Sequence, residues 1–490
     1  MNINVYFSDI FNVSEDLINE YGAFNISLIN DVPLFIDPFL LFGSEDEKYQ
    51  ELHKNMLKYL YFLKENARQG KVSKGLLKSW YCFPEVKQNW FGFSKVGNCG
   101  RGLGLKFGRA LNDNLHSIFA NFGEETVTSG KHLEKLCIIK DHVGRDNISD
   151  FTTNLIKDFL LEYTQTFALE HIDSKFLKRR FIPRVYFDYK LQRWHPKEFT
   201  LPYHNGDYAI LTPKNILTKD DNWINASDMH YQFEEILNSV PDGIIRAEIN
   251  NFLRQCLPED PTKDDERKAY NMVYREFTQL MDYYIKYKED NSEKAISESS
   301  LKVQETENLF IHHARELITQ IYNETNFYEK SQNTYDDAIE RINFLKDVIE
   351  NKDGYRLFYL KGKPIQRETD LHIMYRLTWF ASPVDVNREV NNGRGPVDFK
   401  LSNGDKDKTL VEFKLAKNTG LKKNLQHQVE IYKKANNTKK SIKCILYFSP
   451  EEYFRVKRIL EELFLSNDKN IILINASKDD KISASKATSS

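Results

Sequence analysis

Residues 393–416, GRGPVDFKLSNGDKDKTLVEFKLA, decide how the C-terminal part of this chain folds. Two strand-like runs, PVDFKLS and TLVEFKLA, flank a charged turn that opens on Asn-Gly, which is typical of an antiparallel β-hairpin. Side chains alternate along a strand, so Glu412 and Lys414 project to one side while the apolar residues beside them enter the core. Pairing across the turn would bring Asp398 beside Glu412. The hairpin is therefore predicted to gather two carboxylates and an ammonium.

The segments around the hairpin predict an α/β domain. Apolar positions recur every three or four residues before and after it, and apolar runs of strand length alternate with these helical stretches. The expected order is a helix, three strands, a helix, a strand, a helix and a strand. These elements are expected over residues 366–380, 384–390, 396–402, 409–416, 422–436, 442–449, 451–464 and 470–475.

Two carboxylates that converge on a strand pair make a hard-oxygen site. Such a site suits Mg²⁺ or Mn²⁺, neither of which needs histidine or cysteine. An E-x-K tripeptide alone carries little information, because charged residues alternate on any strand that faces solvent. The signal becomes specific when it is combined with the glycine-framed Asp398 and with Gln428 and Tyr432, which lie four residues apart and share one helix face.

This combination resembles motifs II and III of the PD-(D/E)XK nuclease superfamily. The order is Pro396-Val397-Asp398, then 13 intervening residues, then Glu412-Phe413-Lys414. One departure is that the proline does not immediately precede the aspartate. Gln428 and Tyr432 are similar to the QxxxY motif on the helix that follows the active-site hairpin in several branches. The resemblance covers about residues 354–477 and implies a restriction-endonuclease-like fold with an α-β-β-β-α-β core.

The resemblance also implies a chemistry. Asp398 and Glu412, with the backbone carbonyl of Phe413, would hold Mg²⁺ or Mn²⁺. The metal would lower the pKa of a bound water and neutralise the charge that builds on the phosphate. Lys414 would orient that water and stabilise the transition state.

The first acid of the family pattern has two candidates. Glu389 precedes the Asp398 strand, as an acid does in related families with a GR-x-D signature, and is ranked first as a metal or water ligand. Glu368, on the opening helix, is ranked second. Gln428 and Tyr432 are assigned to contacts with phosphate or with the residues around the site, not to the chemistry itself.

The charge distribution favours a nucleic-acid partner. The formal net charge is −2, but between Lys361 and Lys440 there are 17 Lys and Arg against nine Asp and Glu. A basic segment on a mildly acidic chain is expected where phosphates are bound. The lysines proposed to contact the nucleic-acid backbone are Lys400, Lys417, Lys422 and Lys423.

The rest of the chain is assigned more coarsely. A length of 490 residues predicts two or three domains. Residues 1–260 are expected to form an α+β domain, 261–353 a helical connector, 354–477 the nuclease-like domain and 478–490 a mobile tail. Three connector helices are expected over 269–287, 303–322 and 335–351, and the polar stretch 288–300 is expected to loop out or break the helix.

Two aspartates outside the hairpin are interpreted as structural caps. Asp37 is interpreted as capping a turn with Pro38, and Asp150 as an N-terminal helix cap with Ser149 and Thr152. A cluster of His142, Arg145, Asp146 and Asp150 is a weaker candidate for a ligand site.

Composition excludes several classes. Hydrophobic residues make up 41% of the chain and aromatic residues 13%, which indicates packed globular structure. No run approaches the 18 or so apolar residues of a membrane span, and the N-terminus lacks a signal-peptide pattern, so a cytoplasmic protein without membrane contact is expected. The five cysteines are scattered without a CxxC pair, so ordinary thiols are expected.

The sequence thus predicts a Mg²⁺- or Mn²⁺-dependent endonuclease or exonuclease that acts on DNA more readily than on RNA, in restriction, phage defence or repair. The N-terminal region would select the target, or bind a protein or small-molecule regulator. The alternative is a protein that keeps the nuclease fold but only binds nucleic acid or senses a ligand. The sequence leaves the oligomeric state open.

Overall fold

The computed structural model describes two compact units, formed mainly by residues 2–307 and 308–490. The division lies inside the segment 261–353, which the sequence suggested as a connector. The described residues are 5–70, 72–92, 102–118, 127–135, 145–219, 222–327, 333–352, 354–360, 363–365, 368–379, 385–391, 396–403, 407–428, 438 and 440–478.

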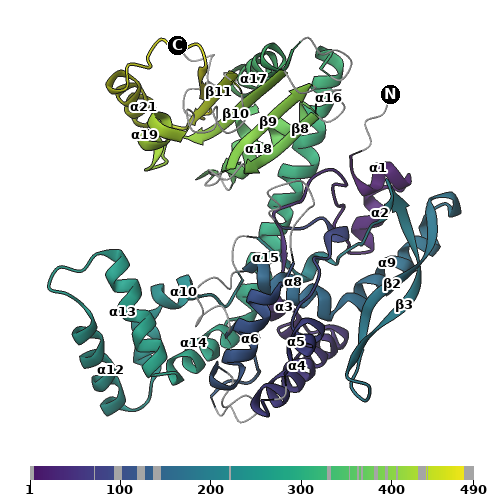
Figure 1. Cartoon of the computed structure of the whole chain (residues 1–490), viewed down its shortest axis with the longest axis vertical. Helices are drawn as coiled ribbons and strands as arrows, with labels where there is room; N and C mark the ends of the chain where they lie inside the picture. Colours follow the sequence, from purple (N-terminus) through teal and green to yellow (C-terminus); the bar gives the residue numbers. More distant parts are fainter. Residues whose placement is uncertain are drawn as a thin grey trace, which may run out of the picture. The chain divides into compact units, whose positions relative to one another are not determined.

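The unit of residues 308–490 is built on a five-stranded mixed sheet (Figure 1). Its strand order is β12-β11-β10-β9-β8; the hairpin strands and β8 are antiparallel, whereas β11 and β12 run parallel to β10. All five strands predicted for this region are present, with ends that move by at most two residues. They are β8 (Asp385–Asn391), β9 (Pro396–Asn403), β10 (Asp407–Leu415), β11 (Lys440–Tyr447) and β12 (Ile471–Asn475).

Helices accompany this sheet in the predicted order. The opening helix is α18 (Glu368–Leu377), and the helix between β11 and β12 is α21 (Pro450–Glu462). The helix expected over 422–436 is described only at its start, as α19 (Leu421–Lys423) followed by a π-helical turn, Asn424–Gln428.

One helix of the predicted connector belongs to the sheet. Helix α17 (Thr334–Asn351) contacts β9 to β12. At its first residue, the Thr334 backbone N–H donates to Asp407 Oδ2 (2.8 Å), and the Thr334 and Thr409 hydroxyls lie 2.8 Å apart. The predicted boundary at residue 354 separates α17 from this sheet, whereas the cap joins Thr334 to residues 73 and 75 positions later in β10.

The buried guanidinium of Arg341 fastens α17 to its surroundings. Its side chain donates to the carbonyls of Thr378 (3.1 Å) and Phe327 (2.5 Å) and lies over the Trp379 ring, 4.0 Å from the centroid. Arg341 is 1% exposed. Because these carbonyls are also buried, the guanidinium satisfies groups that would otherwise lack a partner.

The unit of residues 2–307 combines many helices with a few strands, as expected for a mixed α+β region. Its largest sheet is the three-stranded β2-β3-β4, dominated by a long antiparallel hairpin. The strands are β1 (Phe35–Ile36), β2 (Leu177–Asp188), β3 (Arg193–His204), β4 (Asp207–Tyr208) and β5 (Leu217–Thr218). The helices of eight or more residues are α4 (Glu47–Arg68), α6 (Leu105–Ile118), α8 (Arg145–Leu155), α9 (Lys157–His171), α12 (Gly243–Cys256), α13 (Lys263–Glu276), α14 (Gln279–Asp290) and α15 (Ser292–Glu307), and the shorter ones are α1 (Phe7–Phe11), α2 (Glu15–Glu20), α3 (Pro38–Phe42), α5 (Lys74–Trp80), α10 (Ala226–Tyr231) and α11 (Phe233–Ser239).

One helix prediction is wrong in this unit. The first connector helix is interrupted at Phe277, whose backbone leaves the helical region (φ −111°, ψ 68°), so α13 and α14 are separate. Of the two alternatives for the polar stretch 288–300, the helix break is confirmed: Asn291 separates α14 from α15, and the rest of the stretch is helical. The stretch is helical although it is polar, because the few apolar residues of α15, among them the buried Ala295, suffice to pack it.

The aspartate predictions have opposite outcomes. The Asp37 carboxylate caps α3 by accepting the Phe39 N–H (3.0 Å), as predicted, and its second oxygen accepts the Trp223 N–H (2.8 Å). Asp150 is not a cap, because α8 begins five residues earlier at Arg145. His142 of the proposed ligand cluster lies outside the described residues.

We expect Arg341→Met to lower the unfolding free energy by on the order of 3 kcal/mol, because methionine leaves the Thr378 and Phe327 carbonyls buried without a donor. Scanning calorimetry would measure the change. Glu340→Ala, at an exposed position on the same helix, is the control and should leave the melting temperature within about one degree. Equal melting temperatures for Arg341→Met and wild type would contradict this role.

Candidate functional site

The hairpin strands part at Asp398. Regular pairing of β9 with β10 extends to Phe399 and Val411. Beyond this pair, the Phe413 backbone N–H donates to Asp398 Oδ2 (2.7 Å). A side-chain carboxylate of β9 thus binds the backbone of β10 where the regular pairing ends.

The Lys414 ammonium lies among three acceptors at this point. Its Nζ is 3.3 Å from Asp398 Oδ2, 3.4 Å from Glu368 Oε2 and 3.0 Å from the Phe413 carbonyl oxygen. The other oxygen of Glu368 accepts the backbone N–H of Leu415 (3.2 Å). Three elements, β9, β10 and the first turn of α18, therefore meet at one cation.

Both polar residues of the E-x-K segment are buried, which corrects the expectation that they point away from the core. Glu412 is 5% exposed and Lys414 9%, while Phe413 on the other face is fully buried, as predicted. The face that carries Glu412 and Lys414 is also covered, because Ile445, which pairs with Lys414, packs in an apolar cluster with α19 and α21. Alternation located the two faces but did not reveal that both are covered.

The pKa values of the two carboxylates are shifted in opposite directions. Burial would raise the pKa of Asp398, but the charge and hydrogen bond of His372, the Lys414 ammonium and the Phe413 N–H together hold this pKa well below its usual value. Glu412 has less compensation: burial raises its pKa to about 7, and the charge of Asp398 adds to the rise although Lys414 opposes it. The carboxylates raise the pKa of Lys414 despite its burial.

His372 is a site residue that the sequence analysis missed. It lies four residues after Glu368 and hence on the same face of α18. Its Nε2 is 3.4 Å from Asp398 Oδ2, and its ring lies edge-on to Phe399, with 5.4 Å between the centroids. The only signal in the sequence was the E-x-x-x-H spacing within the predicted opening helix.

The other predicted residues have mixed outcomes. Glu368, ranked second as the first acid, is the one whose side chain contacts Lys414. Glu389 lies in β8 between residues paired with Phe399 and Val397, but its side chain lies outside the described ones, so its role stays a prediction. Gln428 ends the π-helical turn, and its side chain and the whole of Tyr432 are likewise outside the described part.

Two of the four lysines assigned to the nucleic-acid backbone have intramolecular partners. Lys422 Nζ lies 2.7 Å from Glu462 Oε2, and Lys417 donates to the Ile365 carbonyl (2.8 Å). Lys423 is exposed and Lys400 half-buried. An exposed pair such as Lys422–Glu462 is weak and can be exchanged for a phosphate contact.

The donor set suits a hard cation in charge and atom type. Asp398, Glu412 and Glu368 supply carboxylate oxygens, and the unfavourable ionisation of Glu412 indicates a deficit of positive charge. Within the described part of the chain, however, no three His, Cys, Asp or Glu side chains are close enough to hold a metal ion by themselves. A metal would therefore need the Phe413 carbonyl, water molecules or a further acid in addition.

Comparison with protein families gives two matches. Residues 12–225 match a domain of unknown function, DUF8370, and residues 334–450 match a second one, DUF8371. No curated protein and no solved structure matches the chain. The second match begins at the first residue of α17 and includes Glu368, Asp398, Glu412 and Lys414, which agrees with the assignment of α17 to the unit of the site. Among the described helices, none is long and apolar enough to cross a membrane.

The raised pKa of Glu412 predicts a pH-dependent stability. Between its unfolded value near 4.5 and its folded value of about 7, the folded protein keeps a proton that the unfolded chain releases, so stability should fall as pH rises through this window. With a chelator present, Glu412→Gln should be more stable than wild type by on the order of 3 kcal/mol at pH 8, and the two should be nearly equal at pH 4.

Thermal melting from pH 4 to pH 8 would test this prediction. The control is Glu461→Gln, at an exposed position on α21, which should follow the wild-type pH profile. A stability difference between Glu412→Gln and wild type that does not change with pH would show that Glu412 ionises normally in the folded chain.

Proposed function

We propose that the unit of residues 308–490 is a metal-dependent nuclease that hydrolyses phosphodiester bonds of nucleic acid, DNA in preference to RNA. The observation that carries this proposal is the cluster at the end of the regular β9–β10 pairing, where the buried Lys414 contacts the partly exposed Asp398 and Glu368 and lies two residues from the buried Glu412. The element order around it, from α18 through β12, agrees with the resemblance to the PD-(D/E)XK superfamily.

In this proposal Asp398, Glu412 and the Phe413 carbonyl hold the metal, together with one further acid. A bound Mg²⁺ or Mn²⁺ would lower the pKa of a water molecule and neutralise charge on the phosphate. Asp398 is suited to its role because it stays ionised over a wide pH range. Glu412 loses its proton near neutrality, so it becomes an anionic ligand when a cation offsets the repulsion from Asp398.

Lys414 contributes a permanent positive charge. The surrounding carboxylates keep it protonated, so it can hold a phosphate oxygen or orient the attacking water. His372 is a positioning residue in this scheme, because its contact is with Asp398.

The second candidate function is a protein that binds nucleic acid without cleaving it. It is favoured by one observation: within the described residues, the carboxylates surround Lys414 and form no three-ligand metal group. Cleavage and metal binding by the purified protein distinguish the two functions.

We expect wild-type protein with Mg²⁺ or Mn²⁺ to cleave DNA, tested as supercoiled, linear and single-stranded substrates beside RNA, and EDTA to abolish cleavage. Asp398→Asn, Glu412→Gln and Lys414→Met should each lower the rate by roughly 100-fold or more, because each removes charge from the reacting centre. Arg458→Ala, at an exposed position on α21, should cleave at the wild-type rate. Wild-type turnover by all three site variants would exclude this active site.

Comparison of Glu368→Gln with Glu389→Gln belongs to the same assay. Because Glu368 contacts Lys414, we expect its replacement to cost more activity. A larger loss from Glu389→Gln would assign the first acid to β8, as the sequence ranking did.

Metal uptake is the second test and does not depend on turnover. Calorimetric titration of wild type with Mn²⁺ should show binding at millimolar concentration or tighter, accompanied by a rise in melting temperature through mass action. The Asp398→Asn, Glu412→Gln double variant should lose this binding, because its amides carry no charge. Ca²⁺ should bind but support little cleavage, since its looser geometry positions water poorly. Equal metal uptake by wild type and double variant would refute the metal site.

A further inference from the structure

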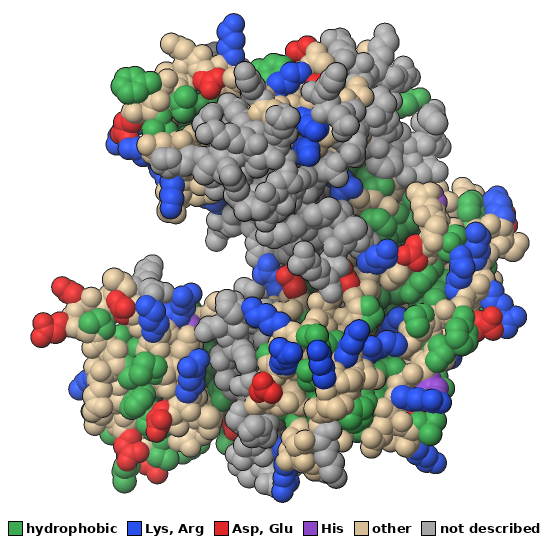
Figure 2. Space-filling model, in the orientation of Figure 1, with side chains coloured by type: hydrophobic (Ala, Val, Ile, Leu, Met, Phe, Trp, Pro, Cys, Tyr) green, Lys and Arg blue, Asp and Glu red, His purple; other side chains and the backbone are tan. Residues whose placement is uncertain are grey.

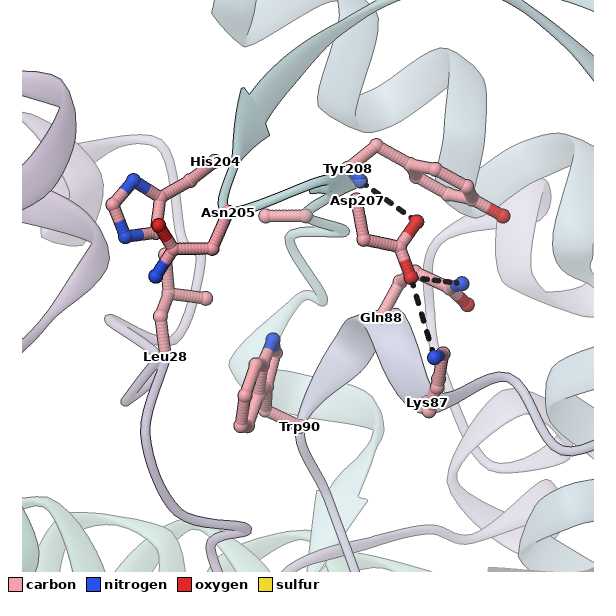
Figure 3. A pocket seen from close by; sticks show the side chains of 9 residues that line it. Leu28, Lys87, Gln88, Trp90, His204, Asn205, Asp207 and Tyr208 are labelled. Atoms are coloured by element: carbon pink, nitrogen blue, oxygen red, sulfur yellow. Dashed lines mark hydrogen bonds and ion pairs between the residues drawn. The ribbon is translucent and has the colours of Figure 1, made fainter. Parts of the chain in front are cut away.

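A half-open cavity of about 230 Å³ lies in the unit of residues 2–307, beside the turn that joins β3 to β4. Three of its nine lining residues carry flat rings, and in Figure 3 the imidazole of His204 and the indole of Trp90 lie on different sides of the space, while the phenol of Tyr208 points away from it. This volume is below that of pockets which enclose drug-sized ligands. It therefore suits one flat ring system whose remaining atoms lie outside.

The polar rim is held in place. Asp207 accepts the Tyr208 backbone N–H (2.9 Å) and the Gln88 side-chain amide (3.0 Å), and Lys87 Nζ lies 3.6 Å from it (Figure 3). A carboxylate has about four acceptor positions, so Asp207 can still accept N–H groups from a ligand. The amides of Gln88 and Asn205 complete a rim that can both donate and accept hydrogen bonds.

Trp90 is placed there at a conformational cost. Its φ of +56° is uncommon for a bulky side chain. Two backbone hydrogen bonds fix this conformation, from the Trp90 N–H to the Lys87 carbonyl (3.2 Å) and from the Val32 N–H to the Trp90 carbonyl (2.8 Å). Strained backbone of this kind is concentrated at binding and catalytic sites.

One cation lines the cavity itself, because Lys87 is among its lining residues and its side chain is half exposed. Two more cations lie on the hairpin over the Tyr203 ring, on the sheet face opposite His204 and Asp207. Lys178 Nζ and the Arg180 guanidinium lie over the Tyr203 ring, 4.0 and 4.5 Å from its centroid, and both cations are exposed.

The hairpin as a whole is basic. Between Leu177 and His204 there are seven Lys and Arg against two Asp and Glu, whereas the whole chain has 69 against 71. In Figure 2, Lys and Arg side chains lie among hydrophobic ones over the region that β2 and β3 occupy in Figure 1. A local excess of cations on a nearly neutral chain attracts phosphate groups.

We propose that this cavity binds a nucleotide. The base lies against Trp90 and His204 with its N–H edge toward Asp207, and Lys87, half exposed at the rim, binds the phosphate. Aromatic walls with hydrogen-bonding groups at the rim are how proteins hold unpaired bases. Burial lowers the pKa of His204, so its ring is neutral and free to stack. A free mononucleotide and an unpaired nucleotide of a strand share this chemistry.

Binding is measured on the full chain in EDTA, which prevents metal-dependent cleavage. The probes are the nucleoside 5′-monophosphates, a labelled 12-nucleotide single strand, the corresponding duplex and inorganic phosphate, followed by calorimetry or fluorescence anisotropy. We expect a monophosphate or the single strand to bind at least tenfold more tightly than inorganic phosphate and duplex. Tighter binding of the strand identifies an unpaired nucleotide as the ligand, and tighter binding of a monophosphate identifies the free nucleotide.

Variants locate the site. Trp90→Leu and His204→Ala should each weaken binding roughly tenfold, as loss of a stacking partner does. Lys87→Gln should weaken it as well and reduce the salt dependence for the strand by about 0.7, the value for one lost phosphate contact. The matched control is Lys106→Gln at an exposed position of α6, which removes the same charge and should bind like wild type.

Three outcomes would overturn the proposal: no binding of any nucleotide probe, equal affinity for inorganic phosphate, or unchanged affinity in both the Lys87 and the His204 variants. Melting temperatures identify a variant that fails to fold. His204→Ala separates this inference from the nuclease proposal, because it should lose nucleotide affinity while its Mn²⁺ uptake stays at the wild-type level. Normal binding without cleavage by wild type would leave the nucleotide site standing and remove the nuclease.

Discussion

The Lys414 ammonium is the charge on which the local structure of the C-terminal unit depends. It lies 3.3 Å from Asp398 and 3.4 Å from Glu368, which come from two other elements. Burying these carboxylates without a cation would cost several kcal/mol for each charge. The ammonium therefore allows α18 to begin beside the end of β10, and it holds the two hairpin strands at the point where their regular pairing stops.

The Lys414 ammonium offsets only part of the effect of burial and of neighbouring negative charge on Glu412. Burial and the neighbouring Asp398 raise its pKa to about 7, so the folded chain carries a carboxylate that ionises at a cost. Perturbed groups of this kind are common where a protein binds a charged ligand, since the ligand then supplies the missing charge. The cost at Glu412 and the proposed affinity for a divalent cation have one physical origin.

The unit of residues 2–307 concentrates its unusual features in another place. There a strained tryptophan and a histidine line a small cavity together with Lys87 and Asp207. We propose that the unit of residues 308–490 uses its charges to hydrolyse a phosphodiester bond and that the unit of residues 2–307 uses its rings to hold a base. Under both proposals the ligand is nucleic acid or one of its components.

The sequence by itself determined the features that depend on neighbouring residues. Alternation and the Asn-Gly turn located β9 and β10, and Asp37 was identified as a cap, because both signals act over a few residues. Only the tertiary structure decided that Glu412 and Lys414 are buried, that Glu368 and His372 reach the hairpin, that α17 joins its sheet, and that Trp90 and His204 line one cavity. Each of these depends on contacts between segments tens of residues apart, where packing and desolvation, which local periodicity does not encode, select the partner.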